Sequence, residues 1–357
     1  MNKKILIIVG STGGHYIPAT VLAETIRKIS PSISIIFAGE KKIKNLEIWK
    51  EKHFRFIKIP VIKRPKKLNF FLFPFQLIYV GIVSLLLIKK QKPNLIVGFG
   101  SYTTAIPILA GIMLKQNLII HEQNYVAGIT TKILNFFGAP VALSFSETQK
   151  YLLKKKFYIT GFPIREEFYS EKSSISLNSL NLKENKTTIL VTGGSQGAKF
   201  INSLIIKTIP LLNPLKYQII HITGKKDFEN VKNSYKKFNI NCYITDFSLK
   251  IYDFMKISDI IISRCGAGTI AEITSIKKPA ILIPFKFAGG HQFFNGRYCD
   301  EKKACVVIKE KEITPQKLFD LIEKVKENIE EFKLNFKNIN IADTKGNFAE
   351  LCIKLIR

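Results

Sequence analysis

Two segments of this chain repeat one pattern: a short strand, a glycine loop and then a helix. Lys4 and a run of apolar residues at 5–9 come first, the loop Gly-Ser-Thr-Gly-Gly-His occupies 10–15, and apolar residues then recur at helical spacing. Residues 188–192 and the loop Gly-Gly-Ser-Gln-Gly at 193–197 repeat this opening, and a helical pattern follows from Ala198. Because such openings begin βαβ units, the chain is predicted to form two similar α/β domains.

Short apolar runs alternate with helical stretches throughout both halves, which is typical of buried parallel strands. The expected strands are Ser34–Ala38, Leu95–Val97, Leu118–Ile120, Val141–Leu143, Tyr158–Thr160, Gln218–Ile222, Cys242–Ile244, Ile260–Ile262 and Ala280–Ile283. Each half therefore reads as a Rossmann-like doubly wound sheet. Gly161-Phe162-Pro163 and the serine-rich stretch 170–179 mark the linker. Since ligands bind beyond the carboxyl ends of such strands, two facing domains predict a cleft that holds the chemistry.

The charge of the chain indicates an anionic partner. The 357 residues carry a formal net charge of +28 while 46% of them are apolar, which excludes a disordered chain. Nucleic acid, an anionic membrane and a phosphorylated ligand all remain open, and a genome rich in Lys would explain part of the excess. Five cysteines without a CxxC pair indicate neither a zinc site nor a disulfide framework, and the N-terminus shows no signal peptide.

The glycine loops are candidate phosphate sites, because a helix N-terminus presents free N–H groups and a positive dipole end. Neither loop has the Lys-Ser/Thr of a P-loop or the acidic residue of a dinucleotide fingerprint, which disfavours both of those functions. A tight strand-to-helix turn is the structural alternative for either loop.

Residues 263–272, Ser-Arg-Cys-Gly-Ala-Gly-Thr-Ile-Ala-Glu, read as a strand end, a turn of small residues and a helix start. Small residues let a diphosphate approach the backbone, Thr269 can bond a phosphate oxygen, and Glu272 can bind two ribose hydroxyls. The alternative is a capping box formed by Thr269 and Glu272.

Three further polar groups are candidates for ligand binding. His291, Gln292 and Asn295 can converge at one helix end and suit a sugar, or they can be a polar helix start. His-Glu-Gln-Asn at 121–124 follows a buried strand, where polar clusters are often functional. His15 closes the first glycine loop and can take a proton near neutral pH.

Seven ordered motifs resemble the MurG family, the bacterial transferases that add N-acetylglucosamine to the undecaprenyl-diphosphate muramyl-pentapeptide precursor. They are GSTGGH at 10–15, GFGSY at 98–102, HEQN at 121–124, GFPIR at 161–165, GGSQGA at 193–198, SRCGAGT at 263–269 with Glu272, and HQ at 291–292 with Asn295. The chain departs from the family pattern at Ser11, Phe162 and His291, where the family usually has Gly, Asn and Gln.

The resemblance implies a GT-B fold of two domains. Residues 1–161 would form an N-terminal domain for the acceptor and the membrane, on which a C-terminal helix at about 342–357 would pack back, and residues 162–341 would form the domain for the UDP-sugar donor. It implies UDP-N-acetylglucosamine and the polyprenyl-diphosphate-linked acceptor as substrates and a cell-wall synthesis complex as a further partner. It implies neither a cofactor nor a bound metal.

The resemblance also assigns roles to individual residues. Ser195 and the turn at 267–269 would hold the diphosphate, Glu272 the ribose, Phe247 and Ser248 the uracil, and Gln292 the sugar. The donor and substrate residues implied are Thr12, Gly13, Gly14, Asn124, Arg165, Ser195, Phe247, Ser248, Ala267, Gly268, Thr269, Ile270, Ala271, Glu272 and Gln292. The reaction would be a single displacement with inversion, with His15 as the general base.

Residues 68–88 are almost wholly apolar and reach the length of a membrane span. A span would separate the strands on either side of it, so we expect a helix that is buried on one face and exposed on the other. Residues 41–92 contain fourteen Lys or Arg and two Glu, a net charge of +12. We therefore expect peripheral attachment to the cytoplasmic face of the plasma membrane. The expected contacts are Lys66, Lys67, Phe70, Phe71, Phe73 and Phe75. An ordinary core helix with solvated lysines is the alternative.

Three other functions remain in competition with this one. A related transferase could use another lipid acceptor such as diacylglycerol, although the HEQN motif favours the cell-wall acceptor. A basic nucleic-acid-binding protein fits the charge, but the chain has no recognition-helix or RNA-binding motif. A non-catalytic membrane scaffold is disfavoured because the donor motifs are intact.

Overall fold

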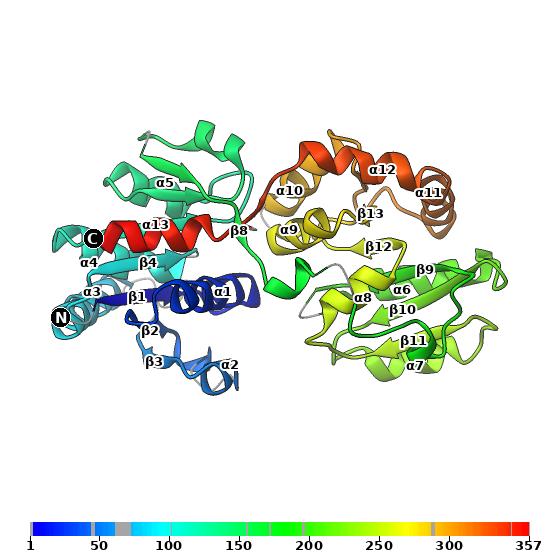
Figure 1. The fold of residues 1–357 in the computed structure, drawn as a ribbon, viewed down its shortest axis with the longest axis horizontal. Helices are drawn as coiled ribbons and strands as arrows, with labels where there is room; N and C mark the ends of the chain where they lie inside the picture. The colour runs from blue at the N-terminus through cyan, green and yellow to red at the C-terminus, as the bar shows by residue number, and fades with distance from the viewer. Residues whose placement is uncertain are drawn as a thin grey trace. The chain divides into compact units, whose positions relative to one another are not determined.

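The computed structural model describes residues 3–43, 47–60, 73–100, 102–154, 156–170, 173–194, 197–286, 290–343 and 345–356 (Figure 1). The chain divides into two compact units. Unit 1 comprises Met1–Pro163 and Asp343–Arg357, and unit 2 comprises Ile164–Ala342. These divisions lie within two residues of the boundaries expected from the sequence, and the last helix belongs to unit 1.

The core of unit 1 is a seven-stranded parallel sheet of order β3-β2-β1-β4-β5-β6-β7. Its strands are β1 (Lys4–Val9), β2 (Ser34–Gly39), β3 (Arg55–Lys58), β4 (Leu95–Phe99), β5 (Leu118–Glu122), β6 (Val141–Leu143) and β7 (Phe157–Ile159). β1 lies in the middle, with Ile7 opposite Phe37 on one side and Val97 on the other. The strand order reverses between β1 and β4, so the loops after these two strands flank the switch point where ligands of such sheets bind.

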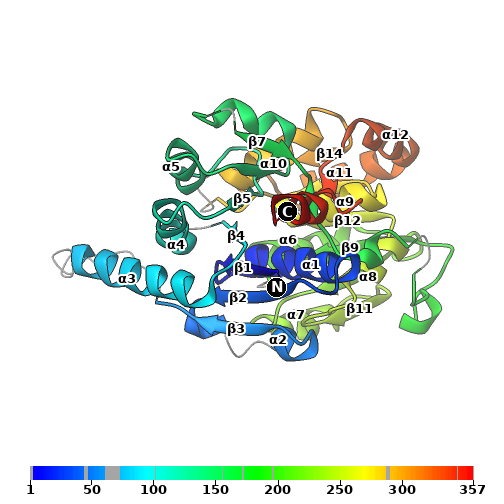
Figure 2. The same cartoon turned by 60° about the vertical axis from the view of Figure 1, so that its left-hand side comes forward.

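Helices cover both faces of this sheet (Figure 2). α1 (Gly13–Ile29) and α13 (Asn347–Ile356) pack on the face that carries Ile5, Ile7 and Val9. α3 (Phe73–Gln91), α4 (Tyr102–Met113) and α5 (Ile129–Phe136) lie on the other side, where Leu6 and Ile8 point. Because both faces of the sheet are covered, every β1 residue from Ile5 to Val9 is buried and apolar.

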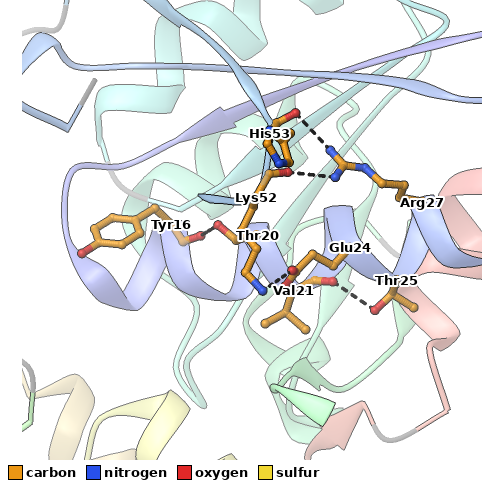
Figure 3. A network of polar contacts seen from close by, with 8 residues as sticks. All are labelled: Tyr16, Thr20, Val21, Glu24, Thr25, Arg27, Lys52 and His53. Atoms are coloured by element: carbon orange, nitrogen blue, oxygen red, sulfur yellow. Dashed lines mark hydrogen bonds and ion pairs between the residues drawn. The ribbon is translucent and has the colours of Figure 1, made fainter. Parts of the chain in front are cut away.

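α1 is fixed at its far end by a polar network with the turn after α2 (Glu47–Glu51), as Figure 3 shows. The Arg27 guanidinium donates to the carbonyl oxygens of Lys52 and His53 at 2.8 and 3.4 Å and lies 4.0 Å from the ring centroid of Phe54. Lys52 pairs with Glu24 at 2.6 Å. Because Arg27 satisfies carbonyls at the end of α2, it ties α1 to the start of β3.

Unit 2 contains a six-stranded parallel sheet of order β11-β10-β9-β12-β13-β14. Its strands are β9 (Thr187–Thr192), β10 (Tyr217–Ile222), β11 (Cys242–Thr245), β12 (Ile260–Ser263), β13 (Ala280–Leu282) and β14 (Cys305–Val307). The order reverses between β9 and β12, and the two candidate phosphate turns follow these two strands. A separate two-stranded sheet joins β8 (Phe162–Pro163) to β15 (Ala342–Asp343).

Two groups of helices surround this second sheet. α6 (Lys199–Thr208), α7 (Phe228–Tyr235), α11 (Pro315–Glu327) and α12 (Ile329–Asn335) share one apolar core with Ile189 and Val191 of β9. α9 (Ala267–Ile276) packs against α8 (Ile251–Ile257) and α10 (His291–Asp300). Short 3-10 helices occupy Lys41–Ile43, Ser146–Tyr151, Glu166–Phe168, Asn178–Leu180, Ile209–Leu211 and Phe336–Asn338.

The fold class and the strands expected from the sequence are confirmed, with three differences. β3 and β14 were not expected, because each is a partly exposed strand at the edge of its sheet. The long apolar helix runs over Phe73–Gln91 rather than 68–88, and residues 61–72 lie outside the described part of the chain. Within the serine-rich stretch, Ser173 and Ser174 donate hydrogen bonds to the buried Asp253 carboxylate of α8.

Candidate functional site

In unit 1 the glycine loop after β1 lies beside the loop after β4. The Gly10 N–H donates to the Phe99 carbonyl at 3.3 Å. Thr12 is the N-cap of α1, and its carbonyl accepts the His15 N–H at 2.9 Å. Gly13 is buried, whereas Thr12 and Gly14 are exposed, so Thr12 and Gly14 are accessible at the switch point.

His15 is held against Gly100 of the neighbouring loop. Gly100 has φ +44°, and a Cβ there would lie 2.8 Å from both Nδ1 and Cε1 of His15. Nδ1 is buried and has no hydrogen-bond partner among the described residues. Burial lowers the pKa of His15 to about 4, so the ring is neutral at pH 7 and can accept a proton or a hydroxyl hydrogen bond.

Glu122, at the end of β5, organises the segment that follows it. Its Oε1 accepts from the Asn124 N–H at 2.9 Å and from Asn124 Nδ2 at 3.2 Å. Its Oε2 accepts from the Gly128 N–H at 2.9 Å and from Thr131 Oγ1 at 2.5 Å. This buried carboxylate is therefore committed to loop structure, and it positions Asn124 rather than facing a ligand.

His121 is also an internal group. It is buried among Phe99, Phe162 and Phe348, and its Nε2 lies 3.1 Å from Ser144 Oγ. Burial lowers its pKa to about 3, so it is neutral at pH 7. The expectation that all of residues 121–124 would offer polar side chains at the site is wrong for the first two. Phe162, a departure from the family pattern, packs on this imidazole.

In unit 2 the loop after β9 depends on its glycines. Gly194 and Gly197 have φ +81° and +72°. A Cβ at Gly193 would lie 2.2 Å from the Ala198 nitrogen, and one at Gly197 would lie 2.4 Å from the Thr223 carbonyl oxygen. Only glycine fits such approaches, which explains the sequence of the loop. Ser195, expected to bind the diphosphate, lies outside the described residues.

The turn after β12 leads into α9 without a capping box. Gly266 is the N-cap and makes no side-chain cap bond, so Thr269 is the third helical residue and Glu272 lies in the second turn. The capping-box alternative for Thr269 and Glu272 is therefore wrong. Ala267, Ile270 and Ala271 are buried in the packing of α9, whereas Gly268 and Thr269 are partly exposed at its start.

Glu272 and Arg165 influence one another electrostatically. Desolvation raises the pKa of Glu272 to about 7, and the positive charge of Arg165 opposes that rise. Arg165 Nη1 donates to the Leu249 carbonyl at 2.7 Å, and its guanidinium lies 5.3 Å from the ring of Tyr252. Its Nε is buried without a hydrogen-bond partner in the described part of the chain. Arg165 thereby holds the segment that contains the predicted uracil-binding residues.

Those two residues lie in the loop between β11 and α8. Phe247 is 44% exposed, which leaves its ring face available for stacking. The Phe247 carbonyl accepts from Thr245 Oγ1 at 3.2 Å, and Ser248 Oγ accepts the Lys250 N–H at 3.0 Å. These local bonds give the loop a defined shape.

Gly290, whose φ is +79°, is the N-cap of α10. The three polar residues that were expected to converge at this helix end have different surroundings. Gln292 Oε1 accepts the Phe285 N–H at 2.9 Å, and His291 Nδ1 is buried with no partner among the described residues. Asn295 is fully buried, and its Nδ2 lies 3.4 Å from the Cys265 carbonyl. Asn295 thus supports the turn before α9, which corrects the expectation that it lines a sugar site.

Sequence reasoning missed two buried groups next to these loops. Arg264 donates to the Ile283 carbonyl at 3.1 Å and pairs with Glu310 at 2.7 Å, which joins the ends of β12 and β13. A polar row of Asn202, His221 and Tyr235 lies under the first turn. In the sequence, the one indication of these two buried groups was a polar residue within an apolar pattern. Within the described ranges, no group of three or more His, Cys, Asp or Glu could hold a metal ion.

α3 presents an apolar face to the outside. Val80, Ser84 and Ile88 are buried toward the unit, and α3 packs on α4. Phe75 is 71% exposed, and the other exposed large apolar residues of α3 are Ile78, Tyr79, Ile82 and Leu86.

α3 is long and apolar enough to span a membrane by length and composition. However, β3 and β4 flank it and belong to one sheet, so a crossing would divide that sheet. Phe73 is only partly exposed, and Lys66, Lys67, Phe70 and Phe71 lie outside the described residues.

Comparison with known proteins identifies both halves of the chain. Residues 5–143 match the glycosyltransferase family 28 N-terminal domain, and residues 188–354 match its C-terminal domain. The chain is 36% identical over 336 residues to the UDP-N-acetylglucosamine–N-acetylmuramyl-(pentapeptide) pyrophosphoryl-undecaprenol N-acetylglucosamine transferase of Halothermothrix orenii, covering 90% of each chain. It is 32% identical to the Bacillus pumilus protein of the same name, covering 93% of this chain and 92% of the relative.

Solved structures share the fold. The crystal structure of Acinetobacter baumannii MurG superposes with a TM-score of 0.80 at 22% identity, covering 99% of both chains. A putative UDP-N-acetylglucosamine 2-epimerase from Listeria monocytogenes superposes with a TM-score of 0.71 at 10% identity, covering 98% of this chain and 95% of that one. At such identities the likeness establishes the fold and leaves the reaction to other observations.

Proposed function

The chain belongs to the N-acetylglucosamine transferases of glycosyltransferase family 28, and on that premise we propose how it performs their reaction. It is a hexosyltransferase that transfers N-acetylglucosamine from UDP-N-acetylglucosamine to the N-acetylmuramyl-pentapeptide carried on undecaprenyl diphosphate. This assignment rests on sequence identity above 30% over nearly the whole length of several relatives with this name. The fold alone does not identify the reaction, because a putative UDP-N-acetylglucosamine 2-epimerase shares it.

We propose that unit 2 binds the donor at the loops after β9 and β12. The exposed start of α9 supports diphosphate binding, because a helix N-terminus leaves backbone N–H groups open to an anion. The glycines of the loop after β9 support it because they let a ligand approach the backbone closely. Glu272, one turn further along α9, would accept hydrogen bonds from the ribose hydroxyls. Phe247 and Ser248 would contact the uracil, and Arg165 would hold their loop through Leu249.

The Gln292 carbonyl oxygen already accepts the Phe285 N–H, so its amide NH₂ is the group that would donate to the donor sugar. His291, which replaces a family Gln, begins the same helix. By the resemblance, Asn124 would contact the donor, and the Glu122 carboxylate fixes the Asn124 side chain.

We propose that His15 accepts the proton of the attacking hydroxyl. The muramyl hydroxyl oxygen forms a bond to the anomeric carbon, while the bond from that carbon to the diphosphate oxygen breaks and UDP leaves with the electron pair. The hydroxyl proton passes to the neutral His15 ring. The N-terminus of α9 would stabilise the charge that grows on the diphosphate, so the proposal needs no metal, and full activity in EDTA is expected.

We propose that unit 1 attaches peripherally to an anionic membrane through the exposed face of α3. Five large apolar side chains on that face and Lys89 and Lys90 at its end support this proposal. Wild type should co-sediment with anionic vesicles at low salt, and Phe75→Asp should weaken this binding. Met113→Asp, an exposed apolar position on α4, is the matched control. Equal binding by Phe75→Asp and wild type would contradict attachment through α3.

The assigned activity is tested by offering UDP-N-acetylglucosamine with either the muramyl-pentapeptide lipid or diacylglycerol and measuring UDP release. We expect turnover with the first acceptor and none with the second. Turnover with diacylglycerol alone would replace the acceptor assignment, and a lack of transfer to either would overturn the proposal.

A further inference from the structure

A buried row of polar side chains lies beneath the glycine loop of unit 2. Asn202 on α6, His221 on β10 and Tyr235 on α7 are 1%, 0% and 3% exposed. None of them is accessible to a substrate, and the proposed chemistry uses none of them. Burying polar side chains is costly unless they are hydrogen-bonded, and the partners of these three show what the row supports.

The hydrogen bonds of this row have determined directions. Asn202 Nδ2 donates to the Thr223 carbonyl at 3.0 Å and to Asp227 Oδ2 at 2.8 Å, which turns its Oδ1 toward His221 Nε2 at 3.0 Å. Because an amide oxygen only accepts, Nε2 carries the hydrogen. Nδ1 therefore accepts from the Tyr235 hydroxyl at 2.9 Å. Burial lowers the pKa of His221 to about 3, so this neutral tautomer persists at pH 7.

The row ends at the carbonyl against which the glycine loop packs. A Cβ at Gly197 would lie 2.4 Å from the Thr223 carbonyl oxygen and 2.9 Å from the Gly224 Cα. The Thr223 and Gly224 N–H groups donate to Thr245 and Asp246 at 3.0 and 2.9 Å. The same two residues thus contact the diphosphate loop on one side and, on the other, the segment that leads to Phe247.

We propose that Asn202, His221 and Tyr235 are positioning residues that hold Thr223 and Gly224 in place and thereby fix Gly197, the last glycine of the diphosphate loop. The inference rests on the proposed function, because it assigns that loop to the donor diphosphate. The three side chains act through the backbone at 223–224 and touch no substrate. Their loss should weaken binding of the diphosphate-bearing donor while the acceptor step continues at saturating donor.

The test compares two buried tyrosines whose hydroxyls have different partners, His221 for Tyr235 and Glu323 for Tyr217. Tyr235→Phe removes the hydroxyl that orients His221, whereas Tyr217→Phe removes a buried hydroxyl that donates to Glu323 away from the loop. Calorimetry should show UDP binding about fivefold weaker in Tyr235→Phe, the effect of one lost hydrogen bond. Binding by Tyr217→Phe should equal that of wild type. KM for the donor should rise in Tyr235→Phe with kcat nearly unchanged.

His221 supplies a second comparison. His221→Gln keeps one donor and one acceptor and should retain most UDP affinity, whereas His221→Leu keeps neither and should lose about tenfold or more. Wild-type affinity in Tyr235→Phe and in His221→Leu would overturn the inference, as would an equal loss in Tyr217→Phe. If His221→Leu does not fold, the two tyrosine variants and His221→Gln decide the question. Wild type that binds no UDP would instead overturn the proposed function.

Discussion

His15 and Gly100 are in direct contact, although 85 positions of sequence separate them and they follow different strands. A Cβ at Gly100 would lie 2.8 Å from His15 Nδ1. The placement of the proposed base therefore depends on the absence of a side chain in the neighbouring loop. This contact explains why position 100 is glycine.

Gly100→Ala should displace the His15 ring and lower kcat by about tenfold or more, since small misplacements of a reacting group are costly. It should also lower stability by about 1 kcal/mol, because alanine is strained at φ +44°. Gly138→Ala is the matched control. Gly138 has φ +99°, and a Cβ added there would have nothing within 4 Å, so this variant should lose stability and keep kcat. If kcat were equal in the two variants, the contact between Gly100 and His15 would not position the base for catalysis.

His15→Gln should lower turnover by about 100-fold or more while UDP affinity stays at the wild-type value. The pH profile gives a second check. Burial lowers the pKa of His15 from 6.5 to about 4, so the base loses its lone pair only as the pH falls below about 5. The wild-type kcat should therefore not fall as the pH is lowered from 7.5 to 6. An acid limb centred near pH 6.5 would contradict a buried, neutral His15.

Glu272 should make donor binding depend on pH. Its pKa is raised to about 7 by desolvation, and hydrogen bonds from ribose hydroxyls favour the ionised form. Binding must then release a proton below pH 7, so affinity for UDP-N-acetylglucosamine should rise between pH 6 and 8. The diphosphate diester has no group that titrates in this range. Glu272→Gln should bind more weakly and with little pH dependence, and calorimetry in buffers of different ionisation enthalpy measures the proton released.

Glu122→Gln should destabilise unit 1 by about 2 kcal/mol, because an amide NH₂ would face one of the donors that the carboxylate now accepts. Urea unfolding measures this loss. Glu147→Gln is the control, since its carboxylate accepts from Ser146 at the partly exposed start of a 3-10 helix rather than from four buried or loop donors. Wild-type stability in Glu122→Gln would show that the four bonds do not organise the loop.

Much of the fold was predictable from the sequence, because glycine loops follow the apolar runs of the buried strands. The runs at 4–9 and 188–192 belong to strands buried on both faces of a parallel sheet, so their central residues are consecutive apolar residues, and each run is followed by glycine. The edge strand at 55–58 is half-exposed and begins and ends with a charged residue, so no apolar run marks it. Short edge strands depend on the neighbouring strand for their pairing, which a local pattern does not contain.

The candidate site was less predictable, because sequence spacing does not say whether a polar side chain points outward or inward. His121, Glu122 and Asn295 follow strands or begin helices as ligand-binding residues do, yet they satisfy internal hydrogen bonds. Glu272 and Thr269 allowed a capping box until the helix start at Ala267 excluded it. Such cases are decided by tertiary contacts that join distant segments.

The construction of unit 1 from both ends of the chain sets an order for its assembly during synthesis. Phe348 on α13 covers Phe99 and His121, but it is translated only after the whole of unit 2. Until then the part of this apolar face that α13 covers is exposed, whereas unit 2 is continuous in sequence and can fold first. The nascent first half is therefore the part of this protein that most needs protection from aggregation on the ribosome.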